Sequence, residues 1–301
     1  MILITGGTGQ LGHALEELCV ARGIECRVVS RPAFDFARPE SIAACFNAAR
    51  PDLVVNAAAY TAVDQAETDA AAAAAGNHTG PLALARLCAA ADIPFIHVST
   101  DYVFDGRKGA PYAETDPAAP AGVYGATKRA GEVAILATGA KAVILRTAWV
   151  YGAFGRNFAR TMLAVGRKMP VLRVVGDQRG TPTAAPDLAA AILAIAAKIG
   201  ETGWRPEYHG IFHATGSGET TWHCFASAIF AEAARHGYKV PEVRAITTAD
   251  WPTPAPRPAD SRLDCTRLRR VFGRALPEWR DSLPGIVEGL LTLDGFSQRT
   301  D

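Results

Sequence analysis

Two side chains that can exchange a proton with a substrate, Tyr124 and Lys128, stand four residues apart. On a helix this spacing places both side chains on one face. A nearby ammonium favours the ionised phenol, so we expect Lys128 to lower the pKa of Tyr124 toward neutral pH. That shift would suit a group that passes a proton to an alkoxide. The alternative is a surface pair with no chemical role, because the same spacing is frequent on exposed helices.

Thr100 has a hydroxyl side chain and directly follows an apolar run at residues 93–99. It is a third candidate for the same reaction. Ligands collect at the carboxyl ends of strands in parallel α/β sheets, where a hydroxyl can polarise a carbonyl. We predict that Thr100 hydrogen-bonds a substrate carbonyl oxygen and that Tyr124 donates the proton. Lys128 would tune Tyr124 and hold the ribose of a nicotinamide cofactor, which delivers hydride. The alternative for Thr100 is a helix or turn cap.

Three glycines, Gly6, Gly9 and Gly12, lie between an expected strand at residues 1–5 and an expected helix at residues 10–22. Glycine permits a tight turn and lets the backbone approach a pyrophosphate, while the helix N-terminus offers free amides to the anion. The spacing GxxGxxG differs from the commoner GxGxxG. Its position after the first strand of a βαβ unit nevertheless predicts a dinucleotide site.

The second expected strand ends at Ser30 and Arg31, where an NAD-selective site usually has an acidic residue. Arginine can bind the 2′-phosphate of NADPH through a charge-assisted contact, so this pair favours NADPH. NADH is the alternative cofactor, because an arginine at position 31 could also face solvent without contacting a cofactor. Asp35, followed by Phe36, either contacts the adenosine part of the cofactor or caps the next helix.

The elements that must position these residues alternate between short apolar runs and longer helical stretches, as in a parallel sheet covered on both faces. Strands are expected at residues 1–5, 25–30, 53–58, 93–99, 142–146 and 210–214, and helices at residues 10–22, 39–50, 69–91, 187–199 and from near Tyr124. This order predicts an α/β fold, a Rossmann-type doubly wound parallel sheet with a smaller C-terminal substrate-binding region. We expect residues 1–148 to form the dinucleotide-binding domain. Residues 149–301 would mainly bind substrate, with parts packing back on the first domain.

Composition excludes several functional classes. The 301 residues are 49% hydrophobic and 20% charged, which indicates a folded globular chain. Lys and Arg total 31 against 30 Asp and Glu, so no net field favours a nucleic acid or a membrane as partner. Six cysteines without a CxxC pair, and no basic leader after Met1, favour a cytoplasmic protein without a zinc site.

Several motifs together resemble the extended short-chain dehydrogenase/reductase superfamily. They are the glycine turn TGGTGQLG, the segment at residues 56–60 and the pair formed by Tyr124 and Lys128. More closely, the chain is similar to the family of dTDP-4-dehydrorhamnose reductases. The segments behind this closer resemblance are residues 61–67, 99–106, 146–152, 176–183 and 257–263, and they span nearly the whole chain.

The resemblance implies reduction of the C4 ketone of dTDP-4-dehydro-β-L-rhamnose to dTDP-β-L-rhamnose. Thr100, Tyr124 and Lys128 match the catalytic trio of the family. By the same match, the dinucleotide would contact Gly9, Gln10, Leu11, Asp35, Phe36, Ala59, Tyr60 and Thr61, and the sugar would contact Thr100, Asp101 and Trp149. The alternative for Trp149 is an ordinary large apolar residue at a domain boundary.

The resemblance leaves assembly open. Some members of the family form homodimers through a divalent ion, such as Mg²⁺, held by glutamates. In this sequence Glu16 lies on the first expected helix, but the other ligands find no match. We therefore predict no metal site, and a homodimer stays open.

The diphosphate of a nucleotide sugar needs local donors in a chain whose net charge is only +1. Arg257 and Arg262 are the candidates, and the RPxxS pattern favours Arg257 with Ser261. Two other functions stay open: a reductase or epimerase of another nucleotide sugar, and a non-catalytic regulatory subunit that binds dinucleotide. Intact Thr100, Tyr124 and Lys128 argue against the subunit.

Overall fold

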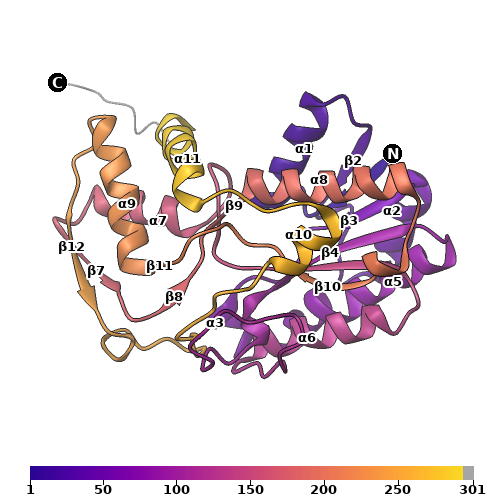
Figure 1. The fold of residues 1–301 in the computed structure, drawn as a ribbon, viewed down its shortest axis with the longest axis horizontal. Helices are drawn as coiled ribbons and strands as arrows, with labels where there is room; N and C mark the ends of the chain where they lie inside the picture. Colours follow the sequence, from indigo (N-terminus) through magenta and orange to yellow (C-terminus); the bar gives the residue numbers. More distant parts are fainter. Residues whose placement is uncertain (294–301) are drawn as a thin grey trace.

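A computed structural model describes residues 1–293, in which two lobes lie side by side (Figure 1). The larger lobe is built on a six-stranded parallel sheet with the strand order β10-β5-β4-β3-β1-β2. Its strands are β1 (Ile2–Thr5), β2 (Cys26–Val29), β3 (Leu53–Asn56), β4 (Pro94–Thr100), β5 (Lys141–Thr147) and β10 (Gly210–His213). The predicted doubly wound parallel sheet is confirmed.

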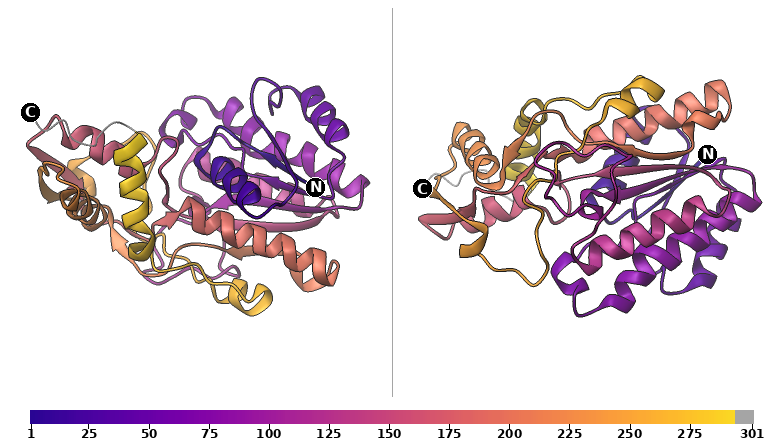
Figure 2. Two further views of the ribbon diagram at one scale, coloured as in Figure 1. Left: turned by 90° about the horizontal axis from the view of Figure 1, so that it is seen from above. Right: turned by 60° about the horizontal axis from the view of Figure 1, so that its bottom comes forward.

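Helices cover both faces of this sheet (Figure 2). α1 (Gln10–Ala21), α8 (Ala185–Thr202) and α10 (Thr266–Phe272) pack on one face, and α2 (Pro39–Ala49), α5 (Gly80–Ala90) and α6 (Val123–Leu136) pack on the other. Successive strand side chains point to opposite faces, so Leu3 belongs to one buried cluster and Ile4 to the other. Because both faces are buried, the strands consist of nearly continuous apolar runs.

The smaller lobe has a separate hydrophobic core around Phe225, Ile229 and Trp279. Its helices are α7 (Phe158–Gly166), α9 (Trp222–Arg235) and α11 (Trp279–Leu293), and its strand pairs are β6 (Val150–Tyr151) with β9 (Thr183–Ala184), β7 (Val171–Val175) with β12 (Glu242–Ile246), and β8 (Arg179–Gly180) with β11 (Thr220–Thr221). α8 and β10 follow residue 149 in sequence but lie in the sheet lobe. The end of the expected second region, residues 294–301, lies outside the described residues.

The alanine-rich stretch at residues 69–91 is not the uninterrupted α-helix that the sequence predicts. After the short α3 (Val63–Ala66), it consists of α4 (Ala70–Ala74), a π-helical turn at Ala75–Thr79, and α5. Alanine propensity favours helix but does not distinguish an α from a π turn. The π turn contains Asn77, whose amide accepts from Tyr60 N at 2.9 Å and donates to Tyr60 O at 3.1 Å. It therefore fixes the loop that follows β3.

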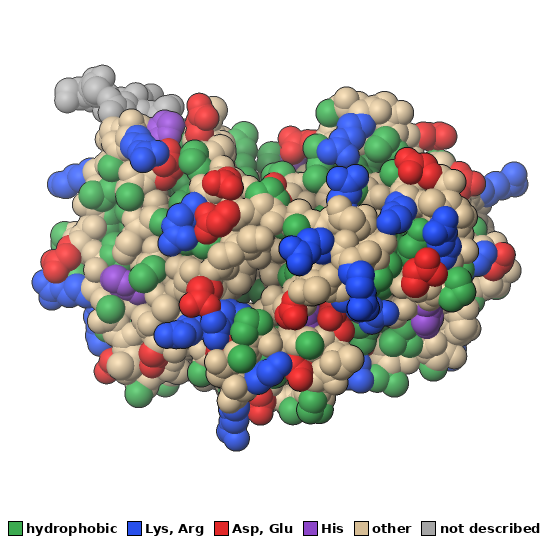
Figure 3. Space-filling view, in the orientation of Figure 1, with side chains coloured by type: hydrophobic (Ala, Val, Ile, Leu, Met, Phe, Trp, Pro, Cys, Tyr) green, Lys and Arg blue, Asp and Glu red, His purple; other side chains and the backbone are tan. Residues whose placement is uncertain are grey.

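The remaining helical segments are short 3₁₀ turns at Asp101–Val103 (η2), Pro206–Tyr208 (η3) and Thr248–Asp250 (η4). Within residues 1–293, no helix has both the length and the apolar character needed to cross a bilayer. Basic and acidic side chains are interspersed over the visible face of the molecule (Figure 3), in keeping with a net charge of +1.

Candidate active site

The strand order reverses between β1 and β3, and ligands of such sheets bind at the carboxyl ends of the strands on either side of that point. Gly6 follows β1 with a φ of +81°, a conformation that only glycine adopts without strain. A Cβ on Gly6 would lie 2.8 Å from Ala58 N, in the loop after β3. The two loops therefore touch backbone to backbone at the switch point.

The amides at the start of α1 have no side-chain cap, and the first turn contains no acidic residue. This N-terminus therefore has free donors for an anion. Gly12 packs directly on the turn, since a Cβ there would lie 2.2 Å from Gly6 O. The Leu11 side chain is buried in the core, so only its main chain is free to meet a ligand. Gln10 donates its Nε2 to Val150 O at 3.1 Å and so ties α1 to the smaller lobe.

The residues predicted to select and bind the cofactor's adenosine end lie just beyond β2. Arg31 is exposed and Ser30 is half-buried. Asp35 Oδ1 accepts from Ala37 N at 3.0 Å, so it stabilises the turn before α2 rather than capping the helix itself. Phe36 packs on Gly80 at the start of α5, where a Cβ would lie 2.4 Å from its ring.

A buried polar chain crosses the sheet below the loop after β3. The Thr5 hydroxyl donates to Asn56 Oδ1, and Asn56 Nδ2 contacts His97 Nδ1 at 2.8 Å. Ala58 N is within 3.3 Å of Thr5 Oγ1. The loop's next residues, Ala59, Tyr60 and Thr61, are thus held from below by Asn56 and from the side by the π turn described above.

Thr100, Tyr124 and Lys128 come together at the carboxyl end of β4. The Thr100 hydroxyl interacts with the Tyr124 phenol, and Tyr124 makes an edge contact with Tyr102, with ring centroids 5.5 Å apart. Lys128 is 1% exposed, and its Nζ donates to Val98 O at 2.7 Å. The structure therefore places Thr100 beside Tyr124 and fixes Lys128 one helical turn further along α6, with Thr100 and Lys128 buried and Tyr124 half-buried.

The predicted pKa of Tyr124 is wrong in direction. Burial, with a smaller contribution from the Asp101 carboxylate, raises the pKa of Tyr124 to about 12, against a lowering effect of the Thr100 hydroxyl. Lys128 does not offset this, because its ammonium is bonded to the Val98 carbonyl and burial lowers its own pKa to about 8. Tyr124 is therefore a neutral phenol at pH 7, the form that can donate a proton.

Asp101 is 2% exposed and accepts a hydrogen bond from Thr100 Oγ1 to its Oδ1 at 3.0 Å. Burial raises its pKa to about 6, although the hydroxyls of Ser261 and Thr100 lower it. Among the described residues, Oδ2 has no hydrogen-bond partner. Ser261 N donates to Arg179 O at 2.9 Å, which brings the segment after residue 260 against this carboxyl. A buried carboxyl oxygen without a hydrogen-bond partner within residues 1–293 thus lies next to Thr100.

Trp149 has an unusual backbone, with a φ of +47° that a bulky side chain rarely adopts. Its indole stacks on Trp222, with ring centroids 3.5 Å apart and planes 9° from parallel. Gly180 lies against the indole, where a Cβ would be 2.4 Å from Trp149 Cε2. Trp149 is half-buried, so the aromatic stack and the glycine together fix an indole that keeps some exposed surface.

The two arginines predicted for the diphosphate are both paired with carboxylates. Arg257 Nη2 lies 2.7 Å from Asp64 Oδ2, which joins the proline-rich segment to α3. Arg262 is bonded to Asp260 Oδ2 at 2.6 Å and to Glu219. The positive charge of Arg257 acts to lower the pKa of Tyr102, whose ring contacts Tyr124. Arg257 is therefore the one of the two arginines that lies near the catalytic residues.

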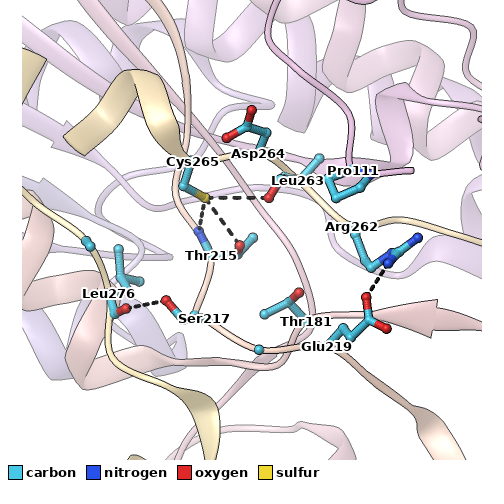
Figure 4. A pocket seen from close by; sticks show the side chains of 13 residues that line it. Pro111, Thr181, Thr215, Ser217, Glu219, Arg262, Leu263, Asp264, Cys265 and Leu276 are labelled. Carbon is cyan, nitrogen blue, oxygen red and sulfur yellow. Dashed lines mark hydrogen bonds and ion pairs between the residues drawn. The ribbon is translucent and has the colours of Figure 1, made fainter. Parts of the chain in front are cut away.

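Arg262 instead lines a separate cavity of about 580 Å³ (Figure 4). Its walls include Thr181, Ser217, Glu219 and Cys265, and the Thr215 hydroxyl lies 3.4 Å from the Cys265 sulfur. None of the catalytic trio lines this cavity. No group of three or more metal-ligating side chains occurs within residues 1–293, and Glu16 is exposed on α1.

Several residues of the site do not stand out in the sequence by themselves. Asn77 is eight residues into the alanine-rich stretch, Trp222 begins α9, and Asp64 is 193 residues from Arg257. Glu132 has a detectable signal: with Tyr124 and Lys128 it continues the four-residue spacing along one face of α6.

Comparisons with known proteins identify the family to which the chain belongs. The family described as RmlD substrate binding domain matches residues 1–291. A dTDP-4-dehydrorhamnose reductase from Sinorhizobium fredii is 42% identical over 291 residues, which are 96% of this chain and 97% of that protein.

Two crystal structures of dTDP-4-dehydrorhamnose reductases are similar throughout. The Clostridium acetobutylicum structure has a TM-score of 0.87 at 36% identity and covers 95% of this chain and 98% of its own. The Bacillus anthracis structure, in complex with NADP, has a TM-score of 0.86 at 31% identity and covers 95% and 97%.

Proposed function

Since the chain belongs to the RmlD substrate binding domain family, we propose that it is an NADPH-dependent oxidoreductase that reduces the C4 ketone of dTDP-4-dehydro-β-L-rhamnose to give dTDP-β-L-rhamnose. The observation that carries the proposal is the cluster of Thr100, Tyr124 and Lys128 at the carboxyl end of β4. It lies at the same edge of the sheet as the uncapped glycine turn.

The residues fit a dinucleotide. Gly6, Gly9 and Gly12 give the backbone access and free amides that a diphosphate needs, and a Cβ at Gly6 or Gly12 would collide with Ala58 N or Gly6 O and force this turn open. The other cofactor contacts in this proposal are the Gln10 and Leu11 main chain, Ser30 and Arg31 at the 2′-phosphate, Asp35, Phe36, Ala59, Tyr60 and Thr61. When bound, NADPH supplies the hydride.

The protein's own part in the reaction is to hold the ketone and deliver a proton. Tyr124 is neutral at working pH and donates to the C4 oxygen as negative charge develops there. The Thr100 hydroxyl, which donates to Asp101 Oδ1 in the structure, turns its single proton to the same oxygen and polarises it. The Lys128 ammonium, fixed by the Val98 carbonyl, adds positive charge and holds the cofactor ribose.

The substrate is recognised at the junction of the two lobes. Asp101 binds a sugar hydroxyl through its unpaired Oδ2, and Trp149 covers an apolar face of the sugar. Arg257 and Ser261 bind the diphosphate side. We also propose that the chain acts in the cytoplasm, where its phosphorylated substrates occur, and that it forms a homodimer, which sedimentation of the purified protein would test.

Replacing Tyr124 by phenylalanine tests the assigned proton donor. The variant keeps the ring but loses the hydroxyl, so turnover should fall about 10²- to 10⁴-fold while NADPH binding is retained. Tyr208→Phe is the matched control, because that hydroxyl bonds Thr202 at 2.9 Å in the turn before β10, away from the site. A Tyr124→Phe enzyme with wild-type turnover would contradict the role.

A further inference from the structure

The last three residues of β4 each contact α6. Val98 O accepts from Lys128 Nζ at 2.7 Å, and Ser99 Oγ donates to Glu132 Oε1 at 2.6 Å. Thr100 follows with its contact to the Tyr124 phenol. The three α6 residues are four apart and so share one helix face. The carboxyl end of β4 is therefore bonded at three successive residues to α6, the helix that contains the proton donor Tyr124.

Glu132 is the centre of this contact. It is fully buried and accepts four hydrogen bonds from three side chains. Arg146 donates its Nε and Nη2 at 2.8 and 2.7 Å, Arg129 donates Nη1 at 2.9 Å, and Ser99 completes the set. Arg146 lies on β5 directly beside Ser99 in the sheet register. One carboxylate thus joins α6, β4 and β5, and a buried charge with this many donors is strongly held.

Lys128 has few charged neighbours. Titratable groups on the elements packed against α6 include His97 on β4, Lys141 and Arg146 on β5, Asp101 on η2 and His78 on the π turn, and α6 itself contains Tyr124, Arg129 and Glu132. Burial holds the pKa of His97 well below its usual range, so that imidazole is neutral. Burial also lowers the pKa of Lys128, and the Glu132 carboxylate is the group that raises it. The protonated form of Lys128 is therefore stabilised by the Glu132 carboxylate, one helical turn away.

We propose that Glu132 is a positioning residue for the reduction: its carboxylate fastens the end of β4 to the catalytic face of α6 and supplies the negative charge opposite the buried Lys128 ammonium. The role in the reduction rests on the proposed function, whereas the effect of the Glu132 carboxylate on the charge of Lys128 does not. A buried ion pair with a purely structural role would affect folding without affecting the titration of Lys128.

The test is the pH dependence of kcat/KM in Glu132→Gln. The variant keeps the shape and an acceptor for Ser99 but removes the charge, so Lys128 should lose its proton at lower pH. We expect the alkaline limb of the profile to move down by about one pH unit. Ser99→Ala is the matched control. It loses the hydrogen bond but keeps every charge, so turnover should fall while the limb stays in place.

A second readout follows Lys128 without substrate. The chain has six lysines, and the Lys128 side-chain carbon resonance can be assigned by its absence in Lys128→Arg. In Glu132→Gln this resonance should titrate about one pH unit lower than in the wild type. If Arg146, left unpaired, prevents folding, the double variant Glu132→Gln with Arg146→Met removes the stranded cation and is measured in the same way.

The outcomes separate the two proposals. Both the alkaline limb and the Lys128 titration unmoved in a folded Glu132→Gln variant, or in the double variant compared with Arg146→Met alone, would overturn the positioning role. A wild-type enzyme that fails to oxidise NADPH with the sugar nucleotide would overturn the proposed function. The Lys128 titration would in that case still decide whether Glu132 controls its charge.

Discussion

Replacing Gly12 by alanine perturbs the cofactor turn at its tightest point. The new Cβ would lie 2.2 Å from Gly6 O, 2.7 Å from Gly6 C and 2.9 Å from Gly7 Cα. Ordinary contacts between nonbonded heavy atoms are about 3.5 Å, so helix and turn must separate by about 1 Å. The turn cannot yield cheaply, because Gly6 N and Gly9 N are bonded to Val29 O and Gly6 O at 2.9 Å.

Two effects of different size are expected. Overpacking of this kind costs about 1–3 kcal/mol of stability. A displacement of about 1 Å in a binding group costs about 100-fold, so NADPH affinity should fall by that order. Urea denaturation measures the first effect, and a fluorescence titration with NADPH measures the second.

Gly200→Ala is the matched control for this experiment. Gly200 lies in α8 with nothing within 4 Å of its Cβ position, so the substitution should leave NADPH binding unchanged and add up to about 1 kcal/mol of stability. The reasoning would be refuted by a Gly12→Ala protein that binds NADPH and unfolds in urea as the wild type does.

Two further substitutions test the substrate side. Asp101→Asn removes a carboxyl whose pKa is raised from 3.8 to about 6, so its ionised form costs up to about 3 kcal/mol above pH 6 and nothing below about pH 4. The variant should therefore be more stable than the wild type at pH 7.5 in urea denaturation and lose that advantage at pH 4; an equal effect at both pH values would speak against a buried ionised Asp101. Gly180→Ala places a Cβ 2.4 Å from the Trp149 indole, so it should raise the KM for the sugar nucleotide and leave NADPH affinity unchanged. An equal loss of both affinities would show that the indole serves the fold and not the sugar.

Much of the sheet lobe was predictable because its elements depend on local signals. Strands such as β3 and β5 are buried on both faces and therefore form apolar runs that are readable without a partner. The glycine turn is likewise a local feature, since the contact between Gly12 and Gly6 joins neighbours in sequence.

The features that sequence reasoning missed depend on contacts between distant segments. The expected lowering of the Tyr124 pKa assumed that helical spacing would direct the Lys128 ammonium toward the phenol. The ammonium instead meets the Val98 carbonyl, 30 residues earlier in the chain. No local signal in the alanine-rich stretch predicts the π turn around Asn77, because that turn depends on the two hydrogen bonds between the Asn77 side chain and the main chain of Tyr60.

The same limit applies to the diphosphate donors. Residue type and composition do not separate Arg257 from Arg262 in the proline-rich stretch, and only the RPxxS pattern favours Arg257. The structure separates them, because Arg257 lies against Asp64 in α3 and Arg262 lines a cavity whose walls include none of Thr100, Tyr124 and Lys128. Long-range pairing of this kind has no signature in spacing or composition.

The central claim is tested most directly by following NADPH absorbance with purified protein and dTDP-4-dehydro-β-L-rhamnose, and by identifying the product. We predict oxidation that requires the sugar nucleotide, is faster with NADPH than with NADH, and yields dTDP-β-L-rhamnose. Protein that binds NADPH but leaves it unoxidised in the presence of this sugar would contradict the account.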